Sequence, residues 1–216
     1  MINICFHGVG VCAREREEGE ARYWVREAHF FRMLDEIAEH DDVRISFDDG
    51  NVSDAAIALP AMQDRGLTGS FFALAGRLED PASLTPADLQ VLRDAGMTIG
   101  THGWSHVPWR GLSETDARRE LYEARSALAE ASAGPVDEAA LPLGRYDRQL
   151  VQRLKDADYT TVYSSDRFPA RSDAWFQARY SVTADDTRES IREIIDHRPL
   201  MQDARNALKS AVKRAR

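Results

Sequence analysis

The sequence lacks several features that mark other classes of protein. Only two cysteines, Cys5 and Cys12, occur among its 216 residues, so neither a disulfide framework nor a cysteine-rich zinc pattern is present. No apolar run approaches the roughly 20 residues that span a bilayer. Residues 1–17 become charged too early for a secretory signal. We therefore expect a cytoplasmic protein in a reducing compartment.

Positive charge is also scarce. The chain carries 28 Lys and Arg against 36 Asp and Glu, a net charge of −8, which disfavours a nucleic-acid-binding surface. Internal repeats and low-complexity segments are missing too. The hydrophobic fraction of 43% and the charged fraction of 30% are those of a globular protein. The length suits one domain with a substantial core.

Strand and helix patterns alternate along the chain. Short apolar runs predict strands at residues 2–6, 43–47, 69–76, 97–103, 138–144, 159–165 and 176–182. Amphipathic periodicity predicts helices between them at 25–40, 53–66, 84–96, 113–131 and 147–157, the second of them kinked or ended by Pro60. Repeated β-α units predict an α/β fold, a single-domain, incomplete (β/α) barrel over residues 1–198. A basic helix at 199–216 is expected to pack on the barrel through its alanines and leucine.

Polar side chains occupy the carboxyl ends of the predicted strands, where (β/α) barrels place catalytic groups. His7 ends the first strand, Asp48 and Asp49 end the second, and His102 follows the fourth, with His106 four residues later. A carboxylate with two imidazoles is a common ligand set for zinc, and three protein ligands leave a position for water. A second carboxylate can take the proton of that water as general base. The positive charge of a metal would also compensate the repulsion between adjacent aspartates.

Each of these signals has a structural alternative. Asp-Asp-Gly is common in turns, a His-x3-His pair is common on surface helices, and a single histidine is often a hydrogen-bonded part of a core. Trp104 and Trp109 would pack in the core or a loop, or their rings would face a sugar as substrate-binding residues. The order of the signals, each at a strand end, favours the catalytic interpretation.

The sequence resembles the polysaccharide deacetylases of carbohydrate esterase family 4 over roughly residues 1–182. "SFDDG" resembles the family motif Thr-Phe-Asp-Asp-Gly, and "THGWSH" resembles the motif His-Ser/Thr-x-x-His. The resemblance implies a distorted (β/α)7 barrel and metal-dependent removal of acetyl groups from sugars. By position it implies Asp48 as general base, and Asp49, His102 and His106 as ligands of a divalent ion, Zn2+ first, with Co2+ or Ni2+ as alternatives.

The catalytic acid has two candidates. "NICFHGVG" resembles the strand-ending histidine of a permuted branch of the family, which implies that His7 protonates the leaving amine. The other candidate is His197 in "EIIDHRP", a segment with the pattern of a helix end and not of a strand end. The strand-end position favours His7.

The third family motif, Arg-x-Pro-Tyr-Gly, is incomplete in "ALPLGRYD". Pro142 is kept and is expected beside the substrate, whereas Ala140 stands in the place of the arginine and Leu143 in that of the tyrosine. The backbone N–H of Leu143 can still face the oxyanion. Arg179, in the last predicted strand, is a candidate replacement for the arginine that orients the base; its alternative is a surface arginine.

The leading hypothesis is a metal-dependent hydrolase that removes acetyl from an N-acetylated sugar or glycan precursor, in carbohydrate metabolism such as exopolysaccharide biosynthesis. A cytoplasmic location favours a nucleotide- or lipid-linked substrate over a wall polymer. The alternatives are an inactive glycan-binding protein on the same fold and an amidohydrolase that cleaves a non-sugar amide. The charged loop at 10–24 either meets substrate or is solvated. The basic stretch 204–216 gives weak support for contact with an anionic membrane surface. The oligomeric state stays open.

Overall fold

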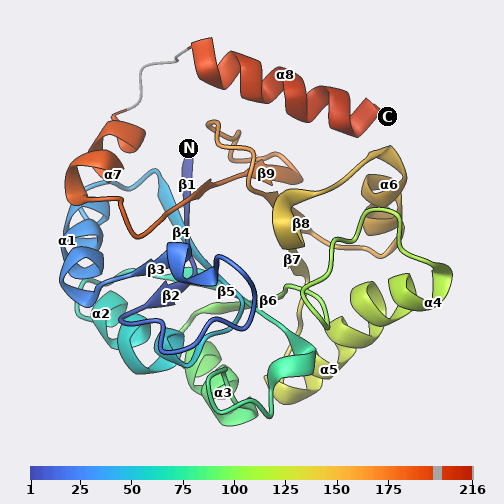
Figure 1. Ribbon diagram of the computed structural model, residues 1–216, viewed down its shortest axis with the longest axis horizontal. Helices are drawn as coiled ribbons and strands as arrows, with labels where there is room; N and C mark the ends of the chain where they lie inside the picture. The colour runs from blue at the N-terminus through green and yellow to red at the C-terminus, as the bar shows by residue number, and fades with distance from the viewer. Residues whose placement is uncertain (197–200, 216) are drawn as a thin grey trace.

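The computed structural model describes residues 1–196 and 201–215, and a parallel eight-stranded sheet curled into a nearly closed barrel forms its centre (Figure 1). Every adjacent pair in this sheet is parallel. A short two-stranded sheet, β2 (Gly8–Val9) with β3 (Trp24–Val25), extends β1 at its carboxyl end. The order around the barrel is β10 (Tyr180–Ser181), β1 (Ile2–Phe6), β4 (Val43–Asp48), β5 (Gly69–Ala73), β6 (Thr98–Thr101), β7 (Glu138–Ala140), β8 (Thr161–Ser164) and β9 (Phe176–Ala178).

The barrel closes through a strand that changes partner at Arg179. Upstream of it, β9 pairs with β8, and downstream β10 pairs with β1. The backbone of Arg179 joins the two parts: its N–H donates to the Ser164 carbonyl at 2.9 Å, and its carbonyl accepts from the Arg167 N–H at 3.1 Å. Together β9 and β10 form the seventh predicted strand. The prediction of a single-domain, distorted (β/α)7 barrel is therefore confirmed.

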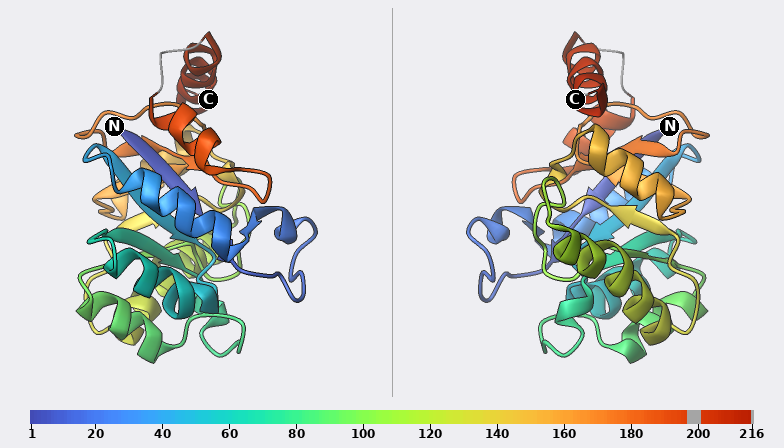
Figure 2. Two further views of the ribbon diagram at one scale, coloured as in Figure 1. Left: turned by 90° about the vertical axis from the view of Figure 1, so that its left-hand side faces the viewer. Right: turned by 90° about the vertical axis from the view of Figure 1, so that its right-hand side faces the viewer.

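Helices surround the barrel on all sides (Figures 1 and 2). Short 3₁₀ turns lie in the connections at η1 (Glu20–Tyr23), η3 (Ala75–Arg77) and η5 (Pro142–Gly144). No helix of the described residues is long and apolar enough to cross a membrane. The covering helices are α1 (Glu27–Ile37), the π-helical turn η2 (Asp54–Ala58) with α2 (Leu59–Gln63), α3 (Pro86–Asp94), α4 (Glu114–Ala117) with η4 (Arg118–Glu123) and α5 (Ala124–Ala131), α6 (Arg148–Asp156) and α7 (Arg188–Ile195).

Pro60 does not end its helix, contrary to one form of the prediction. The helix runs on to Gln63 because the turn before the proline is widened into a π-helix. In that turn the N–H of Leu59 bonds the carbonyl of Asp54, five residues back. A proline ring in a regular helix collides with the preceding turn, and the π-turn supplies a local distortion at that place.

Helix α8 (Met201–Ala215) lies outside the ring of helices, beside α6 (Figure 1). It does not dock through its leucine as expected, because Leu208 is 67% exposed. Polar contacts hold it instead: Ser210 Oγ lies 2.7 Å from the Tyr146 hydroxyl, and Lys213 Nζ lies 2.7 Å from Asp166 Oδ1. The predicted boundary between barrel and helix, at 198/199, lies outside the described residues.

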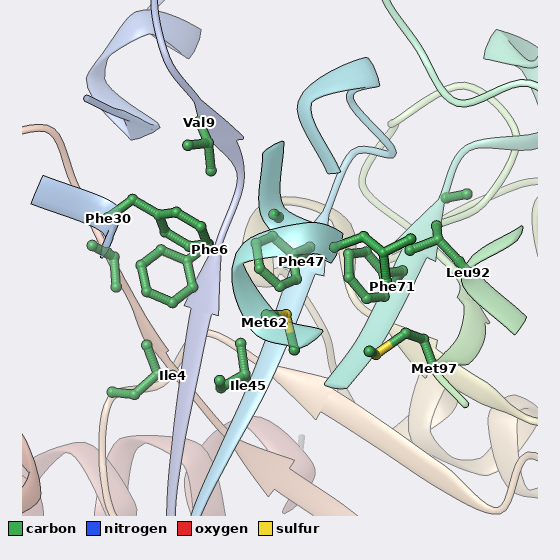
Figure 3. Close-up of a cluster of buried hydrophobic side chains, with 14 of the residues drawn as sticks. Ile4, Phe6, Val9, Phe30, Ile45, Phe47, Met62, Phe71, Leu92 and Met97 are labelled. Carbon is green, nitrogen blue, oxygen red and sulfur yellow. The ribbon is translucent and has the colours of Figure 1, made fainter. Parts of the chain in front are cut away.

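Alternation along β4 turns an apolar side chain toward the helices and polar side chains toward the barrel interior. Phe6, Phe47 and Phe71 face the helices and stack in a row, with ring centroids 5.6 Å and 4.6 Å apart (Figure 3). Ser46 and Asp48 flank Phe47 in β4, and successive side chains of a strand point to opposite faces. The barrel interior therefore carries polar groups that lead up to the strand ends.

A buried carboxylate, Glu36, joins α1 to α7. It accepts hydrogen bonds from Nε and Nη2 of Arg192, both at 2.7 Å, and from Nε of Arg188 at 2.6 Å. The bonds from Arg192 outweigh burial and lower the pKa of Glu36 from 4.5 to about 2. Because the pKa is lower in the folded chain than in the unfolded one, the carboxylate stabilises the fold at neutral pH. That contribution is lost as the pH falls from about 4.5 towards 2.

We expect Glu36→Gln to lower the free energy of unfolding by about 2 kcal/mol at pH 7. The loss at pH 3 should be less than about half as large, because much of the stabilisation that comes from the lowered pKa of Glu36 is already lost at that pH. Urea unfolding at the two pH values measures both. The exposed Glu39, which contacts Arg188 at 3.2 Å, is the control, with a loss below about 0.5 kcal/mol for Glu39→Gln. Equal losses at both pH values for Glu36→Gln would contradict the linkage.

Candidate active site

A cavity of about 320 Å³ opens at the carboxyl ends of the barrel strands. The structure brings to this one place seven residues that the sequence analysis selected from five separate segments. Its walls also include residues of loop 10–24 and of η3. The selected residues in the wall are His7, Asp48, Asp49, His102, His106, Leu143 and Arg179.

Three donor atoms converge in the cavity. Oδ1 of Asp49 lies 3.6 Å from Nε2 of His102 and 3.4 Å from Nε2 of His106. The second nitrogen of each ring is engaged elsewhere: Nδ1 of His102 lies 2.9 Å from the carbonyl oxygen of Ala140, and Nδ1 of His106 lies 2.6 Å from Oε2 of Glu17. Both rings thus present Nε2 to the same carboxylate oxygen.

The burial, hydrogen bonding and protonation of these three groups fit the binding of a divalent cation. Oδ1 of Asp49 is buried and has no hydrogen-bond partner among the described residues, an arrangement that is costly without a compensating charge. Burial lowers the pKa of His102 to about 4, so its ring is neutral at neutral pH, as a ligand must be. Two imidazoles, one carboxylate and hydrogen-bonded outer nitrogens are the usual surroundings of zinc and similar ions.

Three residues in or beside this donor cluster have a strained backbone. Asp49 (φ 75°), His106 (φ 55°) and Leu143 (φ 57°) adopt left-handed conformations, which non-glycine residues rarely do. Gly50 follows Asp49 with φ 62°, and a Cβ at this glycine would lie 3.1 Å from Cα of Ala73. The Asp-Asp-Gly sequence therefore forms a tight turn and also positions two carboxylates at the cavity. Strain of this kind persists where the surrounding structure enforces it, often at active sites.

Asp48 forms a bidentate ion pair with Arg179. Nη1 and Nη2 of the guanidinium each lie 2.7 Å from a carboxylate oxygen, and Nη1 also donates to Ser46 Oγ at 3.0 Å. Burial alone would raise the pKa of Asp48, but the charge of Arg179, followed by that of His102, holds it well below its usual range. Asp48 is thus ionised and fixed in orientation.

The surface-arginine alternative for Arg179 is wrong, because the side chain is only 1% exposed. Its guanidinium carbon lies 5.3 Å and 5.5 Å from the ring centroids of Phe72 and Tyr163. These two aromatic residues form a buried cluster with Ala140. The guanidinium therefore occupies the barrel interior close to the position where the family motif would place an arginine on β7.

His7 and Leu143 flank the same cavity. The His7 ring packs on Tyr23 with centroids 4.7 Å apart, and its Nδ1 is buried with no partner in the described parts of the chain. A ring nitrogen of His7 lies within 4.8 Å of a carboxylate oxygen of Asp48. Leu143 is exposed at the cavity wall. The alternative acid, His197, lies outside the described residues.

Comparison with known proteins agrees with this arrangement. The model of the polysaccharide deacetylase family matches residues 36–162. The chain belongs to the polysaccharide deacetylase family. The match covers Asp49 and the two histidines beside it, whereas His7 and Arg179 lie outside it.

Solved structures of other proteins share the fold. The Streptococcus pyogenes deacetylase PplD, solved in complex with acetate, aligns with a TM-score of 0.77 at 15% identity, over 92% of this chain and 98% of that one. IcaB from Ammonifex degensii aligns with a TM-score of 0.72 at 18% identity, over 91% and 97%. The Bacillus subtilis (strain 168) protein YxkH, named as a polysaccharide deacetylase, is 20% identical over 157 residues, 73% of this chain. The chain spans 56% of the length of that relative.

Three residues predicted to bind substrate do not line the cavity of this family member. Trp109 is 2% exposed and belongs to a buried cluster, so packing describes it better than sugar contact. Trp104 packs on the core, with the guanidinium of Arg119 4.9 Å from its ring. Pro142 is buried within η5, although the neighbouring Leu143 lines the cavity.

Loop 10–24 supplies site residues that the sequence analysis left open. Tyr23 and Glu17 line the cavity, together with Arg77 of η3. Arg16 anchors the loop through hydrogen bonds to Ser83, Glu20 and Asn51. Two sequence signals indicate this role: the loop follows His7 closely, and it is rich in charged residues. Neither signal identifies the residues whose side chains face the cavity.

Proposed function

We propose that this protein is a metal-dependent hydrolase that removes an acetyl group from an N-acetylated sugar or glycan precursor. The observation that carries the proposal is the convergence of His102 and His106 on the unpartnered oxygen of Asp49, beside an ionised Asp48. Family membership supports an acetylated carbohydrate as substrate. Zn2+ is the ion that the donor set fits best, with Co2+ or Ni2+ as alternatives.

The proposal assigns a residue to each step of the reaction. A divalent ion held by Asp49 and the two histidines would acidify a water molecule and polarise the acetyl carbonyl. Asp48 takes the proton of the attacking water as general base, and Arg179 keeps that carboxylate ionised and aimed. The N–H of Leu143 donates to the oxyanion of the tetrahedral intermediate. His7 protonates the leaving amine as the intermediate collapses, releasing acetate and the free amino sugar.

The size of the cavity and the charged residues in its wall indicate a class of substrate. A volume of about 320 Å³ is at the small end for ligand sites, which suits a single acetylated sugar unit. Of the arginines in the wall, Arg77 and Arg179 pair with carboxylates, whereas Arg145 has no partner among the described residues. An exposed lining arginine without a partner in the described part of the chain supports a phosphate-linked sugar, nucleotide- or lipid-bound. The cytoplasmic location, a role in exopolysaccharide biosynthesis and membrane contact through α8 stay predictions.

The alternatives remain an inactive glycan-binding protein and an amidohydrolase acting on a non-sugar amide. The missing arginine at Ala140 favours the inactive protein. The ion pair of Arg179 with Asp48 weighs against it, because a binding protein has no use for an oriented base.

A direct test is acetate release from N-acetylglucosamine oligomers and from nucleotide- and lipid-linked N-acetyl sugars, with and without a chelator. The proposal predicts acetate and free amine in equal amounts, suppressed by the chelator. Binding of these glycans without any acetate release would favour the inactive protein. Chelator-sensitive release from a non-sugar amide alone would favour the amidohydrolase.

His7→Ala separates the acid from the rest of the machinery. An amine leaves only when it is protonated, whereas nitrophenolate leaves an ester unaided. We therefore expect kcat for the N-acetyl sugar to fall by about 10²–10⁴-fold, while hydrolysis of 4-nitrophenyl acetate falls by less than about tenfold. Equal losses on both substrates would remove His7 from the role of acid.

A further inference from the structure

Loop 10–24 reaches the candidate metal site through Glu17. One carboxylate oxygen accepts the Nδ1–H of His106 at 2.6 Å, and the other accepts from the guanidinium of Arg77. Glu17 and His106 are 89 residues apart in sequence. Figure 2 shows the blue loop projecting beyond the barrel on one side. One loop residue thus ties together the second histidine and the turn after β5.

The two histidines are supported in different ways. Nδ1 of His102 is held by the backbone carbonyl of Ala140, the last residue of β7. His106 lies in a connection between β6 and α4, on a left-handed backbone with φ 55°. The only hydrogen-bond partner of its Nδ1 among the described residues is Glu17. The orientation of His106 therefore depends on a carboxylate from another loop.

The contact is built into the loop and is not a chance meeting of surface charges. Arg16, the preceding residue, donates to Glu20 and to Ser83 Oγ at 2.8 Å, and also contacts Asn51. Gly19 turns the chain back with φ 83°. The contacts of Arg16 on one side, and the bond from the Glu20 N–H to the Glu17 carbonyl at 3.2 Å on the other, thus hold the backbone around Glu17.

We propose that Glu17 is a positioning residue for His106, and that ion binding and docking of loop 10–24 are coupled through it. The inference rests on the proposed metal site. The carboxylate keeps the proton on Nδ1, so the lone pair of Nε2 faces Asp49 at 3.4 Å. A carboxylate partner also makes an imidazole a stronger ligand, and losing one typically lowers metal affinity 10–100-fold. Because coupling is reciprocal, the bound ion holds the loop in place.

Chelator competition measures the Zn2+ dissociation constant of the wild type and of three variants. Glu17→Ala should raise it about 10–100-fold. The dissociation constant of Glu17→Gln should lie between those of the wild type and Glu17→Ala, because the amide oxygen still accepts the Nδ1–H. Glu15→Gln is the matched control: it removes the same charge from the same loop, and Glu15 contacts the Ala21 N–H, a bond that the amide oxygen preserves. Its dissociation constant should equal that of the wild type.

Two further readouts distinguish positioning from loss of structure. Zn2+ should slow hydrogen exchange at residues 14–20 in the wild type but not in Glu17→Ala. The visible spectrum of the Co2+ form should change in Glu17→Ala and return towards the wild type in Glu17→Gln. If the wild type binds one ion and Glu17→Ala binds it equally well, this inference is overturned and the proposed function stands. If the wild type binds no ion, both are overturned.

Discussion

Asp48→Asn is expected to lower acetate release by about 10²–10⁴-fold while leaving the ion bound. Asparagine keeps the size of the side chain but cannot accept the proton of the attacking water, a loss of about 10²–10⁴-fold for a general base. The ion depends on Asp49, which the substitution leaves untouched. Acetate release and metal content of the purified variant measure the two effects separately.

The adjacent residue supplies the matched control. Asp49→Asn removes the carboxylate on which His102 and His106 converge, so it should lose the ion and the activity together. Asp48→Asn also leaves Arg179 buried without its counter-charge, and its thermal unfolding temperature should fall for that reason. An Asp48→Asn enzyme with near wild-type turnover would show that another group is the base.

Arg179→Ala is expected to have the largest combined effect on activity and stability. The guanidinium makes both bonds to Asp48 and is itself 1% exposed. Its removal leaves a buried carboxylate unpaired, which costs about 3–5 kcal/mol of folding free energy. The freed carboxylate also loses its fixed direction, and we expect kcat to fall by about 10²-fold, in line with the loss of one charge-assisted catalytic contact.

Two variants separate charge from geometry at this position. Arg179→Lys should restore most of the stability but little of the rate, because an ammonium cannot form the planar two-bond pair. Ala140→Arg in the Arg179→Ala background places a guanidinium in the same buried cluster from β7. Recovery of activity in that double variant would show that the two positions serve one function. Unchanged activity in Arg179→Ala would remove this arginine from the mechanism.

The sequence predicted the parts of the site that depend on topology. Parallel strands in a barrel all end at one face, so His7, Asp48 and His102 were expected together once each was assigned to a strand end. The number of predicted strands indicated an incomplete (β/α) barrel, and the family resemblance implied the (β/α)7 form; the structure adds the break of the seventh strand at Arg179. Period and position along the chain were sufficient to predict the barrel and the shared face of these residues.

Features that depend on packing were beyond the sequence. Trp109 is as compatible with a sugar platform as with a core, and only its neighbours decide for the core. The pairing of Arg179 with Asp48 depends on a strand that changes partner at the seam of the barrel, which no local pattern encodes. The inward turn of Glu17 depends in the same way on the anchoring of Arg16 by two distant side chains, Ser83 and Asn51, and by the nearby Glu20.

Titration of chelator-stripped protein with Zn2+, with bound ion and acetate release measured in the same samples, tests the central claim most directly. The account predicts one ion per chain and an initial rate that rises in proportion to occupancy, with neither effect in Asp49→Asn. Acetate release by the ion-free wild type, or a folded wild type that takes up no ion, would contradict it.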